Sequence, residues 1–160
     1  MIIRIIAVGR LRERHWQDAA ADYARRIRPY ARLEMEEVAE SRLKDGASEA
    51  EENKAMLEEG RAILERLKEH EETVVALDRQ GKSPDSLQMA RWLEEMILEG
   101  QKGVTFVIGG PLGLAPEVLA RADCKLSFSK MTFPHQMMRV ILLEQIYRGM
   151  RIMRKEPYHR

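Results

Sequence analysis

Short apolar runs rich in β-branched residues recur along the chain, and longer segments with apolar residues three or four positions apart separate them. Such runs are typical of buried strands, whereas the wider spacing is typical of amphipathic helices. The sequence therefore predicts strands at 1–8, 33–38, 73–77 and 104–108, with a short fifth strand near Leu126.

Helices are predicted between the strands. Trp16, Ala20, Tyr23 and Ile27 share one face of the first helix, which Pro29 ends. A second helix starts at the Ser-Glu-Ala-Glu segment 48–51, a capping-box pattern in which two side chains bond each other's free backbone amides. Its apolar face continues through Met56, Ile63, Leu64 and Leu67.

Three more helices are predicted in the second half. Ser86 is the expected N-cap of the third helix. The inward positions of this helix are expected to be Ala90, Leu93 and Ile97. A short helix should follow Pro116, and a long one should cover about 134–155.

This alternation predicts the architecture. Each strand is followed by a helix long enough to cross over, so the simplest fold is a three-layer α/β sandwich with a mainly parallel sheet. With 160 residues, 44% of them hydrophobic, the chain suffices for one core but not for two ordinary domains. Residues 1–160 are expected to form a single domain.

The strand at 104–108 opens into the glycine-rich segment Gly-Gly-Pro-Leu-Gly at 109–113. Bare backbone at the carboxyl end of a strand lets a ligand approach closely. A Walker A loop is excluded because Leu-Ala-Pro at 114–116 replaces the required lysine and hydroxyl. The dinucleotide fingerprint also fails, since the spacing is wrong and Asp123 comes too soon. A plain glycine turn remains the alternative to a binding loop.

Composition limits the chemistry. A single cysteine, Cys124, excludes an internal disulfide and a cysteine metal cluster. No metal is expected, because the histidines lack the spacing of a zinc or iron site. They are His15, His70, His135 and His159. No apolar run reaches transmembrane length or follows a charged signal region, so we expect a cytoplasmic protein without membrane contact.

Charge is distributed unevenly around a net value of only +1. Residues 1–33 carry eight basic and three acidic groups, and residues 130–160 carry seven and two. Residues 34–72 carry six basic and fourteen acidic groups. Basic ends of this kind would attract a phosphate backbone, although charged faces are also commonly mere solvation.

Several ordered motifs together resemble one family. They are Ala-Val-Gly at 7–9, Pro-Tyr at 29–30, Val-Ala-Leu-Asp at 75–78, Gly-Lys at 81–82, Ile-Gly-Gly at 108–110, the segment 126–139, Tyr-Arg at 147–148 and Pro-Tyr-His-Arg at 157–160. Over essentially its whole length the chain resembles the ribosomal large-subunit (23S rRNA) pseudouridine N3-methyltransferases of the SPOUT class. The resemblance implies a C-terminal trefoil knot, which no hydrophobic pattern could reveal.

The resemblance further implies S-adenosylmethionine as the cofactor. Its binding residues would be Leu77, Gly109, Phe128, Ser129, Lys130, Met131, Thr132 and Phe133. Backbone groups and apolar side chains at these positions suit a nucleoside with an amino-acid tail. Packing explains Leu77 and Phe128 equally well.

Candidate catalytic residues lie after the cofactor segment and at the tail: His135, Arg139, Tyr158 and His159. His135 can titrate near neutral pH, but a histidine in a helix cap or in the core is the alternative. Arg139 would orient a phosphate or a uracil carbonyl, or else form an ion pair at a subunit interface. Tyr158 and His159 would stack on the target base and accept its proton, whereas a frayed terminus is the default.

The last helix is apolar on more than one side, so a knotted core or a partner subunit must cover part of it. The resemblance implies a homodimer through this helix, with the tail serving the partner's site. Glu144, Arg148, Arg151 and Lys155 are expected on its polar face, the first two as a surface ion pair. The RNA-binding candidates are Arg151, Arg154, Lys155 and Arg160.

The implied reaction is methylation at N3 of a pseudouridine in the helix 69 loop of 23S rRNA in assembled ribosomes. The partners would be the ribosome and a second copy of the chain, with no DNA. Two other classes stay open. A non-catalytic ribosome-binding factor would bind particles without transferring a methyl group, and a nucleotide-dependent oxidoreductase would bind NAD, which the missing fingerprint disfavours.

Overall fold

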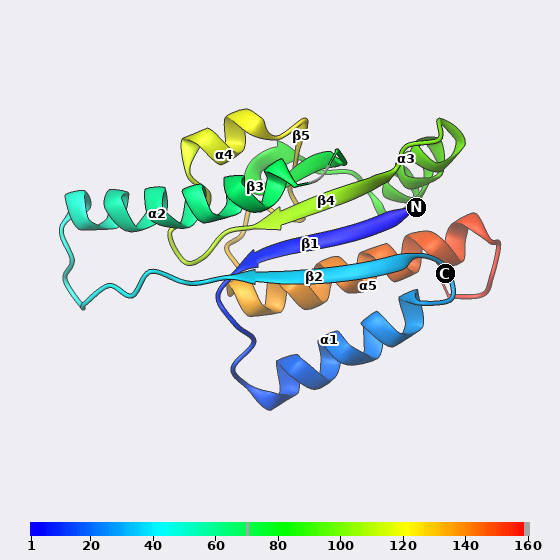
Figure 1. Cartoon of the computed structure of the whole chain (residues 1–160). Helices are drawn as coiled ribbons and strands as arrows, with labels where there is room; N and C mark the ends of the chain where they lie inside the picture. The colour runs from blue at the N-terminus through cyan, green and yellow to red at the C-terminus, as the bar shows by residue number, and fades with distance from the viewer. Residues whose placement is uncertain (70, 159–160) are drawn as a thin grey trace.

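The computed structural model describes residues 1–69 and 71–158, in which strands and helices alternate (Figure 1). The elements are β1 (Ile2–Val8), α1 (Arg14–Ile27), β2 (Arg32–Val38), α2 (Glu49–Lys68), β3 (Thr73–Lys82), α3 (Ser86–Leu98), β4 (Gly103–Ile108), α4 (Pro116–Arg121), β5 (Cys124–Leu126) and α5 (His135–Met153). Every predicted strand and helix is present. β3 continues beyond the predicted range to Lys82.

The strands form one sheet in the order β2-β1-β4-β3-β5. All four pairings are parallel, so the prediction of a mainly parallel sheet is confirmed. In the middle of the sheet Ile5 of β1 lies opposite Met35 of β2 and Phe106 of β4. Because all strands run the same way, their carboxyl ends lie at one edge of the sheet.

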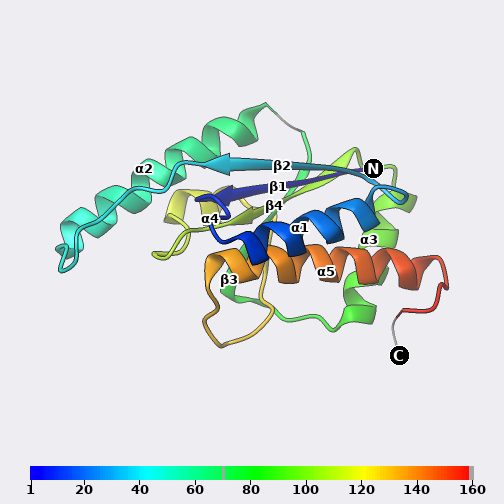
Figure 2. The same cartoon turned by 90° about the horizontal axis from the view of Figure 1, so that it is seen from below.

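Helices cover both faces of the sheet, as Figure 2 shows from below. One core cluster joins the sheet to α1, α3 and α5 and includes Ile5 and Phe106. The other joins the sheet to α2 and α4 and includes Ile6 and Val107. Successive strand residues thus face opposite layers, and the three-layer arrangement is confirmed.

Two helix starts follow from capping chemistry. The predicted capping box of α2 is present, with the Ser48 hydroxyl accepting from the Glu51 amide and the Glu51 carboxylate accepting from the Ser48 amide. For α3 the prediction of Ser86 as N-cap was wrong. Asp85 caps this helix through a reciprocal pair with Gln88, because its carboxylate reaches the amide three residues on.

Two further positions differ from the prediction. Ile97 was expected to point inward but is 45% exposed, and its neighbour Met96 is buried instead. Lys155 was expected on the polar face of the last helix. That helix ends at Met153, and Lys155 has the left-handed φ of 54°, so it lies outside the helical pattern. The predicted ion pair between Glu144 and Arg148 is confirmed at 2.5 Å.

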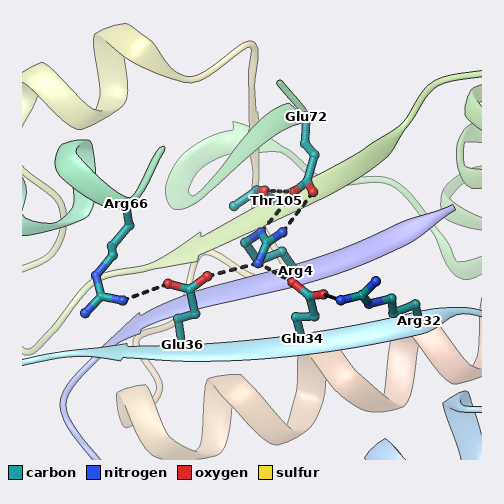
Figure 3. A network of polar contacts seen from close by, with 7 residues as sticks. All are labelled: Arg4, Arg32, Glu34, Glu36, Arg66, Glu72 and Thr105. Carbon is teal, nitrogen blue, oxygen red and sulfur yellow. Dashed lines mark hydrogen bonds and ion pairs between the residues drawn. The ribbon is translucent and has the colours of Figure 1, made fainter. Parts of the chain in front are cut away.

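A charged network lies within the sheet (Figure 3). Arg4 of β1 is buried and pairs with Glu34 and with Glu36 of β2, the latter at 3.0 Å. Two of its nitrogens donate to Glu72, which precedes β3, at 3.1 and 3.3 Å. Thr105 of β4 also donates to Glu72. Arg4 therefore ties the segment before β3 to β1 and β2, and Thr105 ties the same segment to β4. The sequence had placed Arg4 in a buried apolar run.

Neither a membrane-spanning helix nor a metal-binding cluster is found in the part of the chain that the structure describes. No helix there is long and apolar enough to cross a membrane. In the same residues no group of three His, Cys, Asp or Glu side chains could hold a metal ion. Cys124 is half-buried at the start of β5, and burial raises the pKa of its thiol.

Candidate active site

A pocket of about 540 Å³ opens at the carboxyl ends of β3, β4 and β5. This volume is typical of sites that bind small molecules and cofactors. The lining comes from the end of β3, the glycine loop 109–113 after β4, the loop between β5 and α5, and the first turn of α5. The glycine loop and the loop after β5 therefore share one pocket.

The glycine loop is built tightly. A Cβ on Gly109 would lie 2.6 Å from the carbonyl carbon and oxygen of Gly113, so no side chain fits there. The amide of Gly113 donates to the carbonyl of Gly110 at 3.0 Å, and Gly113 has a φ of +86° that favours glycine. The loop thus presents backbone to the pocket.

The loop after β5 is held by its own serines. The buried Ser127 hydroxyl donates to the carbonyl of Ser129 at 3.0 Å. The Ser129 hydroxyl accepts from the amide of Met131 at 3.0 Å. Met131 is 70% exposed, so this turn places a large apolar side chain at the pocket wall.

The end of β3 is joined to this second loop. Ser127 donates its amide to the carbonyl of Lys82 at 2.8 Å, and Arg79 donates to the Thr132 hydroxyl at 3.0 Å. A Cβ on Gly81 would lie 2.6 Å from the backbone of Lys125, so the two chain segments approach as closely as glycine allows. Three strand ends therefore form one continuous wall.

Most of the predicted cofactor-binding residues meet at this pocket. Those that line it are Leu77, Gly109, Phe128, Ser129, Met131, Thr132 and Phe133. Lys130 is not among the lining residues. Sequence reasoning missed Asp78 and Arg79, which also line the pocket. Their position directly after a strand whose end was already expected at the site is the signal that could have found them.

His135 and Arg139 start α5 but differ in surroundings. His135 lines the pocket, and its Nε2 lies 3.4 Å from where a Cβ on Gly9 would be. Arg139 is only 3% exposed and donates to Glu37 at 2.8 Å and to the carbonyl of Gly9 at 2.8 Å. Arg139 therefore ties α5 to the end of β1 within one chain, and it does not line the pocket.

Tyr158 lies away from the pocket of its own chain. Its hydroxyl donates to Glu144 at 3.1 Å, and its ring stacks edge-on against Tyr147. Burial, with hydrogen bonds to Tyr23 and Glu144, raises the pKa of Tyr158. Nine residues of helix separate Glu144 from His135, roughly 13 Å along the axis. His159 and Arg160 lie outside the described residues.

The remaining RNA-binding candidates gather at the far end of α5. Arg151 donates to the Tyr30 hydroxyl at 3.1 Å and pairs with Glu156 at 2.7 Å. The guanidinium of Arg154 lies 4.8 Å from the centre of the Tyr30 ring. Lys155 is exposed. None of these side chains lines the pocket of its own chain.

The comparisons with known proteins now identify the family. The family model described as "Predicted SPOUT methyltransferase" matches residues 1–159. The chain belongs to the SPOUT methyltransferases. This membership confirms the resemblance that the sequence motifs indicated.

Curated relatives and a solved structure agree with this membership. The chain is 48% identical over 160 residues to "Ribosomal RNA large subunit methyltransferase H" of Carboxydothermus hydrogenoformans, covering 100% of both chains. It is 45% identical to "Ribosomal RNA large subunit methyltransferase H 1" of Clostridium perfringens, again over 100% of both. A probable methylase family protein from Haemophilus influenzae shares the fold, with a TM-score of 0.52 at 12% identity, over 99% of this chain and 70% of that one.

SPOUT methyltransferases use S-adenosylmethionine as the methyl donor, in agreement with the cofactor that the sequence predicted. The residues at the pocket fit such a molecule. The backbone of Gly109 lines the pocket and can bond polar groups, and Leu77, Phe128 and Phe133 offer apolar walls to a purine ring.

Proposed function

We propose that this SPOUT methyltransferase methylates N3 of a pseudouridine in the helix 69 loop of 23S rRNA, in assembled ribosomes in the cytoplasm. The full-length similarity to proteins named ribosomal RNA large-subunit methyltransferases supports the substrate class. The observation that carries the proposal is the pocket at the ends of β3, β4 and β5, where the residues predicted for the cofactor come together.

The pocket residues hold and orient the cofactor. Gly109 and the loop 127–133 would provide backbone hydrogen-bonding groups, while Leu77, Phe128 and Phe133 would offer apolar contacts to the adenine. S-adenosylmethionine supplies an activated methyl group on a sulfonium and leaves as a neutral thioether. The chain's contribution is then alignment with the target nitrogen and removal of a proton.

Two histidines are the candidates for proton removal. His135 lies in the pocket wall, and Arg139 fixes the first turns of α5 that carry it by bonding Gly9 and Glu37. His159 belongs to the tail together with Tyr158, which offers a ring for stacking on an unpaired base. On this proposal Arg139 acts by positioning, through the placement of α5.

A homodimer would bring the tail to a pocket. Within one chain Tyr158 bonds Glu144, which lies nine positions after His135 on α5, roughly 13 Å along the axis. The ring of Tyr158 is therefore too far from the pocket of its own chain to touch a base bound there. Part of α5 is only partly buried within the chain, including Met137, Ile141 and Ile152. We infer that a second subunit covers this face and that each tail completes the partner's site.

A trefoil knot at the site would explain how the two loops enclose one cofactor. The segment 125–127 lies directly against Gly81 and Lys82, and Arg79 bonds Thr132 across the same contact. These contacts support a chain that passes through the loop after β3 before α5 begins. A knot of this kind would hold the pocket shape without help from a second domain.

RNA contacts in the proposal come from the basic residues near the end of α5. Arg151, Arg154 and Lys155 lie near the tail, and Arg160 follows it in sequence. In the dimer they would flank the partner's pocket and bind phosphates around the target loop. Since the surface is small, the shape of the assembled ribosome supplies much of the selection.

The test is transfer of labelled methyl from S-adenosylmethionine to ribosomes from cells that lack the modification, with free helix 69 RNA as a parallel substrate. We expect label on intact ribosomes and little on the free RNA. Equal labelling of both would overturn recognition of the assembled particle. No label from a folded protein that binds those ribosomes would favour the non-catalytic binding factor, and binding of NAD in place of S-adenosylmethionine would favour an oxidoreductase.

A further inference from the structure

Glu59 of α2 is a buried acid beside the glycine loop. It is only 4% exposed, and among the described salt bridges none involves it. One carboxyl oxygen accepts from the amide of Ser41 at 2.8 Å. The other oxygen has no hydrogen-bond partner and lies 3.4 Å from where a Cβ on Gly110 would be. The unpartnered oxygen therefore faces the loop that lines the cofactor pocket.

The helix that carries Glu59 is pressed against the same loop. A Cβ on Gly60 would lie only 2.6 Å from the Cβ of Ala115, where the loop enters α4. A Cβ on Gly110 would likewise lie 3.1 Å from the Val8 side chain. The loop is thus packed between α2 and the end of β1, with the buried Glu59 side chain beside it.

The surroundings of Glu59 favour its neutral form. Burial raises the pKa of its carboxyl, the Ser41 amide opposes this, and the nearby charge of Glu40 raises it further. A neutral carboxyl has an O–H group that can donate, while its other oxygen keeps the bond from Ser41. When the carboxyl is protonated, the unpartnered oxygen next to Gly110 can therefore act as a donor.

We propose that Glu59 is a positioning residue for cofactor binding: its carboxyl, anchored by Ser41, holds the Gly109–Gly113 loop in the shape that presents backbone to S-adenosylmethionine. The inference rests on the proposed cofactor pocket. Glu59 acts on the backbone of the loop, and the loop in turn faces the cofactor. Glu59 therefore acts without touching the reacting atoms. The unpartnered oxygen is the one available to the loop backbone, because the other oxygen already accepts from Ser41.

The experiment measures S-adenosylmethionine binding to the full chain by titration calorimetry, without RNA. Glu59→Met removes the polar group while keeping similar volume, and Glu59→Gln keeps both an acceptor for Ser41 and a donor for the loop. We expect Glu59→Met to weaken binding about tenfold, as for one lost hydrogen bond, and Glu59→Gln to stay within about threefold of the wild type.

Glu58→Met is the matched control, since Glu58 is exposed one position away on the same helix. It should bind like the wild type. Thermal unfolding without cofactor distinguishes the proposed positioning role from a purely structural one. A purely structural role would lower the melting temperature of Glu59→Met and leave its affinity for S-adenosylmethionine unchanged. Wild-type affinity in Glu59→Met, or equal weakening in both Glu59 variants, would overturn the inference. Intact binding without methyl transfer to ribosomes would count against the proposed function only.

Discussion

At Gly109 a single methyl group decides whether the glycine loop can close. Because a Cβ there would lie 2.6 Å from the carbonyl of Gly113, Gly109→Ala must push two backbone segments apart. We expect this variant to weaken S-adenosylmethionine binding by at least about tenfold, the loss that a displacement of roughly one hydrogen bond produces. Titration calorimetry measures it.

Gly46→Ala is the control for this prediction. Gly46 also has a positive φ, of +78°, but a Cβ there meets nothing within 4 Å and the residue is outside the pocket. It should lose about 1 kcal/mol of stability or less and bind the cofactor normally. Equal binding of S-adenosylmethionine by Gly109→Ala and Gly46→Ala would show that the loop tolerates a side chain, and it would contradict the assignment of the cofactor site to this loop.

Glu59 also gives the protein a pH-dependent stability. Burial and the charge of Glu40 raise its pKa in the folded state, so the unfolded chain releases this proton first. The contribution is therefore favourable at low pH and is lost as pH rises above the usual glutamate value of about 4.3. Glu59→Gln removes the titration, so its melting temperature relative to wild type should rise between pH 4 and pH 7.

The matched variant Glu58→Gln should show no such trend, because Glu58 is exposed. Melting temperatures from circular dichroism at several pH values give the comparison. A constant difference between Glu59→Gln and wild type across the range would contradict a raised pKa at Glu59.

At the scale of residues, the sequence identified the pocket wall better than the groups behind it. Gly109 and Phe128 belong to motifs with a family resemblance, and both line the pocket. Glu59 was not singled out from the sequence, because on an acidic helix a buried glutamate cannot be distinguished from a solvent-exposed one until its neighbours in the fold are known. Arg139 was expected either to orient a phosphate or a uracil carbonyl or to form an ion pair at a subunit interface, whereas its bond to Gly9 is a long-range contact within one chain that no local pattern reveals.

At the scale of elements, local sequence rules predicted which helices and strands exist better than they predicted where a helix begins and which of its residues face inward. The Ser48 capping box was found because both partners lie within four residues. Asp85 and Ser86 are both good caps, and only the observed backbone shows which one precedes the helix. Met96 and Ile97 are adjacent apolar residues, and packing against α5 and the sheet decides which is buried.

The Arg4 network sets how the strands are fixed to one another. Arg4→Ala would remove the buried guanidinium that pairs with Glu72, so we expect a loss of about 3–5 kcal/mol in the free energy of unfolding. Urea denaturation measures this loss. Arg32→Ala is the control, because Arg32 is exposed and contacts only the rim of the network at Glu34.

The control should cost about 1 kcal/mol or less, as exposed ion pairs do. Similar losses in Arg4→Ala and Arg32→Ala would mean that the buried arginine has no special part in joining the strands. No local pattern predicted this network, because the partners of Arg4 lie about thirty or more residues away along the chain.

At the scale of the whole molecule, the order of the strands in the sheet could not be predicted from the sequence. Periodicity predicts which segments are strands, but the order β2-β1-β4-β3-β5 depends on pairings between distant segments. The same holds for the proposed knot and dimer. The apolar last helix indicated that a knotted core or a partner subunit covers it, but only the family resemblance implied a trefoil knot and a homodimer. The common edge of the carboxyl ends, in contrast, follows directly from a parallel sheet and predicted where the pocket lies.

Mixed dimers test whether the tail acts across subunits. Gly109→Ala disables a pocket and Tyr158→Ala disables a tail, so neither variant alone should methylate ribosomes. If sites are shared, each mixed dimer contains one intact pocket with one intact tail. Random pairing of equal amounts should restore about a quarter of the wild-type activity.

Co-expressed tagged and untagged copies of Gly109→Ala provide the control and should stay inactive. A mixture of the two variants that is no more active than its parts would place the tail in its own chain's site, contrary to the inferred dimer.

The most direct test of the account is nucleoside mass spectrometry of the helix 69 fragment of 23S rRNA. The RNA would come from cells that cannot make this modification themselves and that express either the wild-type chain or Gly109→Ala. We predict a methyl group on N3 of pseudouridine with the wild type and its near absence with Gly109→Ala at equal protein levels. An unmethylated fragment with the wild type, or full methylation with Gly109→Ala, would contradict the proposed reaction or its site.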